Sequence, residues 1–210
     1  MKLSDLFSFG DRYSSVTVQM TSTREWTWAE PGGLWEYRML LTGDYREAEF
    51  PLEFRHYSGK RYDDVLGTGY ASLYLISDRF REVLEKNNFT GWKCFPVRLF
   101  TKKGEEVTGY QGFSVTGRAG RIDREKSEIV YIEYPTGIQE ANYKGIHVDM
   151  EQWDGSDIFM PDKWFGIVMT RKVRDALLAE KITNIRFENM AEYLTPCYMV
   201  TLANKNNDSQ

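Results

Sequence analysis

The residues best suited to chemistry in this sequence are His147, Asp149 and Glu151. They alternate with apolar residues over 146–151, which places the three polar side chains on one face of an expected strand. An imidazole and two carboxylates can hold a divalent cation with one position open for water, so one hypothesis is a metal-dependent enzyme. The alternative, which we favour, is the solvent-facing side of an edge strand, because metal sites generally take ligands from several elements. We therefore expect no metal and no cofactor.

The sequence signatures of common enzyme classes are absent from the chain. It contains no Gly-x-Ser-x-Gly elbow, no His-Glu-x-x-His motif and no phosphate loop ending in Gly-Lys-Ser or Gly-Lys-Thr. Gly67-Thr68-Gly69 has two glycines of a dinucleotide loop, but an apolar strand-like segment follows where a helix is required. We expect a protein that is not an enzyme.

An acidic segment covers residues 128–162. It holds eight acidic residues and one basic residue, Lys144, so it carries a charge of −7 where the whole chain carries −4. A concentrated negative surface can attract a basic protein partner, and tryptophan is a favoured interface anchor. The alternative is a solvated acidic loop without a partner. The expected partner-binding residues are Asp149, Glu151, Trp153, Asp154 and Asp157.

A second binding hypothesis rests on three tryptophans near the N-terminus. Trp26, Trp28 and Trp35 surround a Pro-Gly-Gly turn, and their rings could stack on sugars. This would make the protein a glycan-binding module. Aromatic residues in strands more often pack against the core or a sheet edge, so we place this hypothesis behind protein binding.

The elements that must position these residues include two similar strand–helix–strand units. In the first, an apolar run at 73–76 precedes Ser77, a good helix N-cap, and Phe80, Val83 and Leu84 follow at helical spacing. A strand is expected over 92–100. The same order recurs 93 residues later without a gap, so Ser77 corresponds to Thr170.

This offset predicts an internal pseudo-repeat of residues 71–100 and 164–193. The alternative is that two amphipathic helices entering strands look alike by chance, because both must pack in the same way. In both cases we expect one α+β domain over 1–203, with a mixed or mainly antiparallel sheet and two short amphipathic helices. Residues 204–210 are expected to form a polar tail.

Composition narrows the function classes further. The chain has 210 residues, of which 41% are hydrophobic and 28% charged, as is ordinary for a globular protein. A net charge of −4 and a pI of about 5.4 argue against a general nucleic-acid binder. No apolar run is long enough for a membrane span or a secretory signal, so we expect no membrane association and a cytoplasmic protein.

Two stretches of the chain, 75–96 and 157–187, share a more specific pattern. The second begins with Asp157-Ile158-Phe159, continues through an apolar strand and a basic helix, and returns through Thr183-Asn184 to Phe187. The first has the same order, with Thr90-Gly91 at the return. This pattern resembles the closing segment of a family of bacterial immunity proteins, which neutralise polymorphic toxins.

The resemblance implies a function without catalysis. It implies a stoichiometric inhibitor that acts in the cytoplasm, binds a cognate toxin and carries no catalytic motif. Such an inhibitor would cover the active site of the toxin or block a change in its shape. With the acidic segment, this makes a basic toxin the expected partner.

Overall fold

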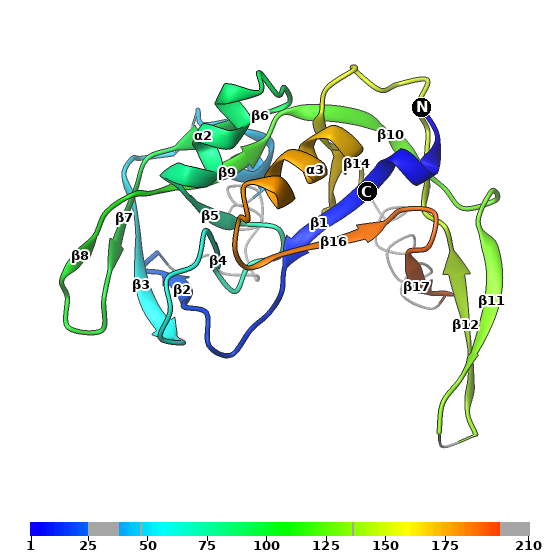
Figure 1. Cartoon of the computed structure of the whole chain (residues 1–210), viewed down its shortest axis with the longest axis horizontal. Coiled ribbons are helices and arrows are strands. Elements are labelled where there is room, and N and C mark those ends of the chain that lie inside the picture. Colours follow the sequence, from blue (N-terminus) through cyan, green and yellow to red (C-terminus); the bar gives the residue numbers. More distant parts are fainter. Residues whose placement is uncertain (25–37, 47, 136, 198–210) are drawn as a thin grey trace.

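The chain folds into many strands and a few short helices, and its structure, a computed structural model, describes residues 1–24, 38–46, 48–135 and 137–197 (Figure 1). The expected α+β class is confirmed, and strand pairs are mostly antiparallel with two parallel pairs. Four sheets are present in the described residues. Two of them contain the strand–helix–strand units.

The first unit is an antiparallel sheet with one helix. Its elements are β4 (Val65–Gly67), β5 (Tyr74–Ser77), α2 (Asp78–Lys86), β6 (Trp92–Phe95) and β9 (Tyr110–Val115), with strand order β4-β5-β9-β6. The predicted cap is confirmed, because Ser77 Oγ accepts a hydrogen bond from the Phe80 amide at 3.1 Å. The predicted apolar face is confirmed as well, since Phe80, Val83 and Leu84 are its buried residues.

The second unit belongs to a six-stranded sheet. Its elements are β14 (Ile158–Asp162), β15 (Ile167–Thr170), α3 (Arg171–Ala179), β16 (Ile185–Asn189), β1 (Leu6–Asp11), β10 (Gly117–Asp123) and β13 (His147–Val148). The order is β13-β10-β14-β15-β1-β16, and β10 pairs with β14 in parallel. Thr170 precedes α3 but makes no side-chain cap bond, in contrast to Ser77.

The two units have the same strand order and the same register. Val65 lies opposite Ile76 in the first unit, and Ile158 lies opposite Met169 in the second, a shift of 93 residues in both strands. The place of β9 is taken by β1, which comes from the other end of the chain. Tyr74 lies opposite Phe113 in β9, and its counterpart Ile167 lies opposite Phe9 in β1. Descent of the two units from one ancestral unit stays a prediction.

The remaining strands form two further sheets. One contains β2 (Gln19–Ser22), β3 (Leu52–Ser58), β7 (Val97–Phe100) and β8 (Glu106–Val107) in the order β2-β3-β7-β8. The other contains β11 (Glu128–Glu133), β12 (Gln139–Lys144) and β17 (Leu194–Pro196) in the order β11-β12-β17. The hairpin of β11 and β12, which we call the arm, projects from the body of the molecule (Figure 1). A short 3-10 helix, η1 (Leu3–Asp5), precedes β1.

One hydrophobic cluster lies beneath both units. It includes Phe80 and Phe113 from the first unit and Phe9, Met169 and Leu177 from the second. The Phe9 ring lies 6.0 Å from the Phe80 ring in an edge-on arrangement, so the two units meet through aromatic packing. The expectation of a single domain over 1–203 stays a prediction, and this shared cluster supports it.

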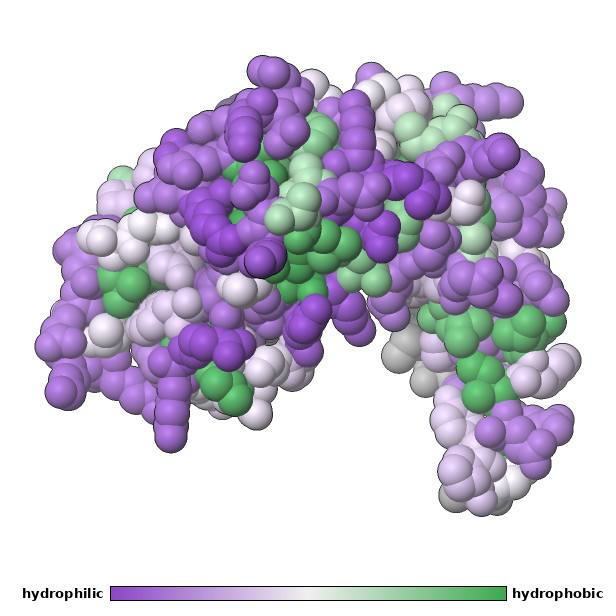
Figure 2. Space-filling view, viewed as in Figure 1, coloured by the Kyte–Doolittle hydropathy of each residue, from purple (hydrophilic) through white to green (hydrophobic). Residues whose placement is uncertain are grey.

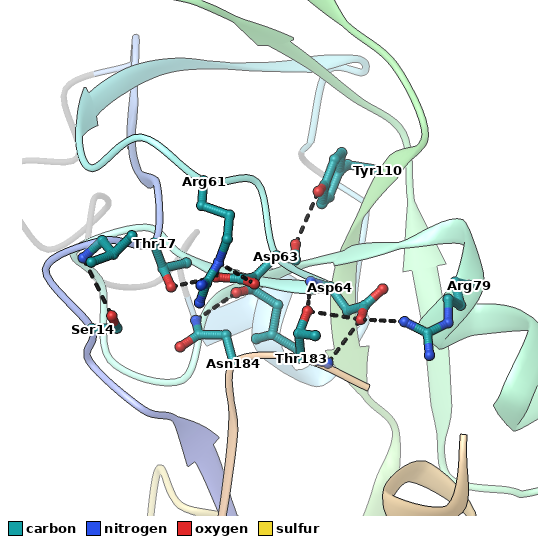
Figure 3. A network of polar contacts seen from close by, with 11 residues as sticks. Ser14, Thr17, Arg61, Asp63, Asp64, Arg79, Tyr110, Thr183 and Asn184 are labelled. Carbon is teal, nitrogen blue, oxygen red and sulfur yellow. Dashed lines mark hydrogen bonds and ion pairs between the residues drawn. The ribbon is translucent and has the colours of Figure 1, made fainter. Parts of the chain in front are cut away.

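Two buried aspartates join the units through reciprocal contacts, which we call the clasps. Asp64 precedes β4 of the first unit, and its carboxylate accepts hydrogen bonds from the Thr183 amide at 2.8 Å and the Thr183 hydroxyl at 2.9 Å (Figure 3). Asp157 precedes β14 of the second unit and accepts from the Thr90 amide at 3.0 Å and hydroxyl at 3.2 Å. Each threonine hydroxyl accepts in turn from the aspartate amide.

Each clasp also carries a cation and orders a helix start. Arg79 pairs with Asp64 at 3.0 Å, and its counterpart Lys172 pairs with Asp157 at 2.5 Å. The Asp64 carbonyl accepts from the Ser77 amide, just as the Asp157 carbonyl accepts from the Thr170 amide. Buried carboxylates require such partners, because an unpaired charge in the interior is strongly destabilising.

The residue after each clasp threonine has a left-handed backbone. Gly91 has φ of 87° and Asn184 has φ of 56°, so both accommodate the turn that the sequence pattern predicts there. A Cβ on Gly91 would lie 2.0 Å from the Ile158 carbonyl oxygen. Asn184 donates from its side-chain amide to the Val65 carbonyl at 2.7 Å, which adds a further bond between the units (Figure 3).

Replacing Thr183 by valine tests the clasp. The change removes the hydroxyl that donates to the buried Asp64 carboxylate and accepts from the Asp64 amide, in two part-buried hydrogen bonds. We expect the free energy of unfolding to fall by about 1–3 kcal/mol in urea denaturation. Thr108→Val, at an exposed position, is the control and should change it by less than about 0.5 kcal/mol. Equal stability of the two variants would contradict the importance of the clasp.

Three tyrosines are held neutral by the fold. Burial raises the pKa of Tyr74 to about 12, with the charge of Asp11 adding to the effect. Burial likewise raises the pKa of Tyr45 and of Tyr110 to about 12. The Tyr110 hydroxyl donates to the Asp63 carbonyl at 2.9 Å, next to the first clasp (Figure 3). Ionisation of these phenols is therefore unfavourable in the folded state.

The raised pKa values of these tyrosines predict how the stability of the protein changes at alkaline pH. A raised folded-state pKa contributes stability that is complete below pH 10, the pKa of an unfolded tyrosine, and is lost as the pH rises towards 12. The free energy of unfolding should fall over this interval. Tyr74→Phe, which cannot ionise at that site, should lose less of its stability between pH 10 and 12 than the unmodified chain. Parallel curves for both proteins would contradict this assignment.

Candidate partner-binding site

The acidic residues predicted to bind a partner lie on the connection between β13 and β14, which runs beside β10. The backbone of Asp149 pairs with β10, since its amide donates to the Arg121 carbonyl at 2.9 Å. Its carboxylate accepts from the Glu151 amide and from the Gln152 side chain, both at 3.0 Å. These bonds fix a turn that carries Glu151 on its exposed side. We call residues 149–154 the acidic turn.

Asp154 closes the acidic turn against β10. Its carboxylate accepts from the Arg118 amide at 2.8 Å and from the amide and hydroxyl of Ser156. Partial burial would raise the pKa of the Asp154 carboxyl, but these hydrogen bonds and the nearby Arg118 charge lower it below its usual value. The side chain therefore stays ionised, although its role is partly structural.

The guanidinium of Arg118 is turned inward. It donates to the carbonyls of Thr42, Val115 and Gly117 at 2.7–3.0 Å. Burial lowers the pKa of Arg118, and the Asp154 charge opposes this effect. Although its amide contacts Asp154, the Arg118 guanidinium thus donates to backbone carbonyls away from the acidic turn.

Trp153 is half-buried and anchors the turn. Its ring lies 6.0 Å from that of Phe159 in a second hydrophobic cluster, and its indole N–H donates to the Ser156 carbonyl at 3.1 Å. The other side of the ring borders an open hollow of about 420 Å³, lined also by Met1, Asp157 and the first turn of α3. Trp153 therefore packs in the second cluster and is also accessible at the surface.

Asp157 does not share the exposed position expected for a partner-binding residue. Only 5% of the residue is accessible, and its carboxylate is occupied by Thr90 and Lys172 in the second clasp. The contacts of Asp157 therefore hold the two units together. Of the five predicted residues, Asp149, Glu151, Trp153 and Asp154 share the acidic turn.

Glu151 is the most available carboxylate of the group. It is exposed, and within the described parts of the chain it makes no ion pair. The pKa of the neighbouring Lys126 is raised mainly by its hydrogen bond and charge contact with Asp123, with smaller contributions from Asp149 and Glu151. The negative potential of the turn is therefore only partly compensated.

The two hypotheses that compete with protein binding have different outcomes. His147 lies on β13 opposite Asp123, and no group of three potential metal ligands occurs among the residues that the structure describes. The set of His147, Asp149 and Glu151 is therefore not assembled as a metal site there. The tryptophans at 26, 28 and 35, which carry the glycan hypothesis, lie outside the described residues.

The sequence analysis missed the exposed apolar residues of the arm. Five of the exposed large hydrophobic side chains lie on the arm or beside it on β17. Ile129 and Tyr131 are on β11, Tyr134 and Ile138 are in the turn that joins β11 to β12, and Leu194 is on β17. The apolar run over 129–132 was a detectable strand signal. It does not distinguish a strand that faces the core from one that faces solvent.

Comparison with protein families defines the class. Residues 10–192 match the model of a family of immunity proteins, the class that the two strand–helix–strand units resemble. Because the match covers most of the chain, the protein belongs to the Imm11 immunity protein family. The family implies a role in immunity to a toxin. A search of curated proteins found no match. None of the helices described is long and apolar enough to cross a membrane.

Chelation tests the metal-enzyme hypothesis. Because the potential ligands around His147 are not brought together, we expect EDTA to leave the melting temperature unchanged to within about 1 °C. Thermal unfolding before and after dialysis against EDTA measures this. A clear drop that zinc or manganese reverses would restore the metal-enzyme hypothesis.

Proposed function

We propose that the protein neutralises a bacterial toxin in the cytoplasm by binding it directly, as a stoichiometric inhibitor without catalytic activity. Membership of the Imm11 family is the observation that carries this proposal. The absence of enzyme signatures from the sequence supports it, as does the absence of a three-ligand metal cluster from the described residues. The proposed partner is a toxin with a basic binding surface.

We further propose the acidic turn as part of the binding surface. The carboxylates of Asp149 and Asp154 accept hydrogen bonds from backbone amides, so their charges have fixed positions before a partner arrives, and the backbone of Glu151 is held between them. A preformed surface loses less conformational entropy on binding than a flexible loop. Fixed negative charges also accelerate the approach of a basic partner.

The stoichiometry of neutralisation separates an inhibitor from an enzyme. The experiment co-expresses the chain with toxin domains encoded in the genome of its host, and then titrates the purified chain into the toxin it protects against. We expect toxin activity to fall linearly and to vanish at one equivalent. Toxin recovered from the complex by denaturation and refolding should be active again. Complete inactivation by a small fraction of an equivalent would overturn the inhibitor proposal.

Neutralising the acidic turn tests the surface. The variant Asp149→Asn/Glu151→Gln/Asp154→Asn keeps side-chain hydrogen-bonding groups but removes three charges. We expect toxin affinity to fall at least about tenfold at low salt, mainly through slower association, and the difference to shrink in 0.5 M NaCl. Surface plasmon resonance at two salt concentrations measures both effects. Asp157 is left unchanged because its loss would disturb the second clasp.

A matched control removes three charges elsewhere. Glu82→Gln/Glu85→Gln/Asp175→Asn changes exposed residues of α2 and α3 and alters the net charge by the same amount. Affinity in this control should stay within about threefold of the original. Equal losses in the two triple variants would show a general charge effect and would remove the acidic turn from the proposal.

A further inference from the structure

The outer strand of the arm has an open edge. β11 pairs with β12 over all six of its residues, from Glu128 opposite Lys144 to Glu133 opposite Gln139. In the described portion of the chain no strand pairs with its other edge, because the order of this sheet is β11-β12-β17. Backbone N–H and C=O groups along that edge are therefore available for a further strand.

The side chains of this edge strand are unusually apolar for their exposure. Ile129 and Tyr131 point to the same face of the sheet, and 54% and 70% of their surface is accessible. Hydrophobic surface is visible on the projecting arm in the space-filling view (Figure 2). Contiguous apolar surface of this kind is typical of an interaction site.

β11 also lacks the usual protection of an edge strand. Natural edges are commonly blocked by lysine, proline, a bulge or a covering segment. Residues 128–133 contain no lysine and no proline, and the ladder with β12 has no register shift. The edge is therefore regular enough to accept another strand by β-augmentation.

The charges at its two ends indicate the chemistry of that strand. Glu128 and Glu133 lie at the two ends of β11, and within the residues described neither makes an ion pair. Lys144, which lies opposite Glu128, is paired with Glu192 at 2.8 Å. An added strand would be favoured by basic side chains near both ends.

Pairing with a second copy of β11 is disfavoured by the same charges. A full-length antiparallel pair of two β11 strands would place Glu128 opposite Glu133 twice. Like charges opposite each other destabilise a sheet. The edge is therefore better suited to a different chain than to a dimer of this one.

We infer that an extended segment of the toxin adds to the open edge of β11 as a further strand, with basic residues near Glu128 and Glu133 and apolar residues against Ile129 and Tyr131. This inference rests on the proposed function and names the mode of binding. It places the main-chain contacts on the arm, separate from the charges of the acidic turn. The two surfaces can therefore be disabled independently.

Charge reversal on neighbouring strands tests the inference. Glu133→Lys changes the edge strand, and Glu140→Lys makes the same change on the inner strand β12 of the same arm. We expect Glu133→Lys to weaken binding to the neutralised toxin at least about tenfold and Glu140→Lys less than about threefold. Hydrogen exchange of the amides of 129–132 should slow in the complex. Unchanged affinity and unchanged exchange would overturn the inference while the inhibitor proposal stands.

A peptide probe covers the case in which the chain neutralises no toxin and the proposed function fails. The probe has two lysines five positions apart, separated by alternating valine and threonine, and its counterpart has glutamates in their place. We expect fluorescence anisotropy to show at least about tenfold tighter binding of the lysine peptide, reversed in Glu128→Lys/Glu133→Lys. No preference between the peptides would overturn the open edge as an acceptor of basic strands.

Discussion

The structure depends on the burial of two carboxylates, Asp64 and Asp157, each of which takes a threonine partner from the other unit. A buried aspartate needs donors, and here the amide and hydroxyl of a threonine provide them in both cases. The backbone carbonyl of each aspartate also accepts a hydrogen bond from the amide of the residue that precedes a helix. Loss of a clasp therefore affects a strand, a helix and the contact between the two units together. The clasps thus convert two similar units into one packed body, whose shared cluster joins Phe9, Phe80 and Leu177.

This arrangement also positions the two surfaces that carry the functional proposals. Asp157 ends the connection that begins with the acidic turn, so the second clasp fixes one end of that turn while the backbone of β10 fixes the other. The arm is built differently, because it leaves the body as a hairpin and contacts it mainly at its base and through β17. One surface is charged and rigid, and the other is apolar with an open edge. A partner that binds both surfaces would first be attracted by the charges of the acidic turn and would then pair with the backbone of β11.

Local features of the fold could be predicted from the sequence, and long-range ones could not. The cap at Ser77, the buried face of α2 and the left-handed residues Gly91 and Asn184 follow from local rules that a single segment satisfies. The replacement of β9 by β1 could not be predicted, because strand alternation contains no information on which strand is its neighbour. The environment of Asp157 was missed for the same reason, since its partner Thr90 lies 67 residues away. The exposure of Ile129 and Tyr131 was missed because the apolar run over 129–132 is the pattern expected of a buried strand.

The position of β1 has a consequence for the synthesis of the chain. Leu6 pairs with Thr170 and Asp11 with Ile185, so β1 has no partner strand in its sheet until about 160 further residues have been made. At typical rates of translation this takes roughly 10–30 s, during which the first unit can already fold on the ribosome. The sheet then closes around a segment that was made much earlier, and such late long-range closure is intrinsically slow. A translation product that ends before Ile167 lacks both β15 and β16, so β1 finds neither of its partner strands in it.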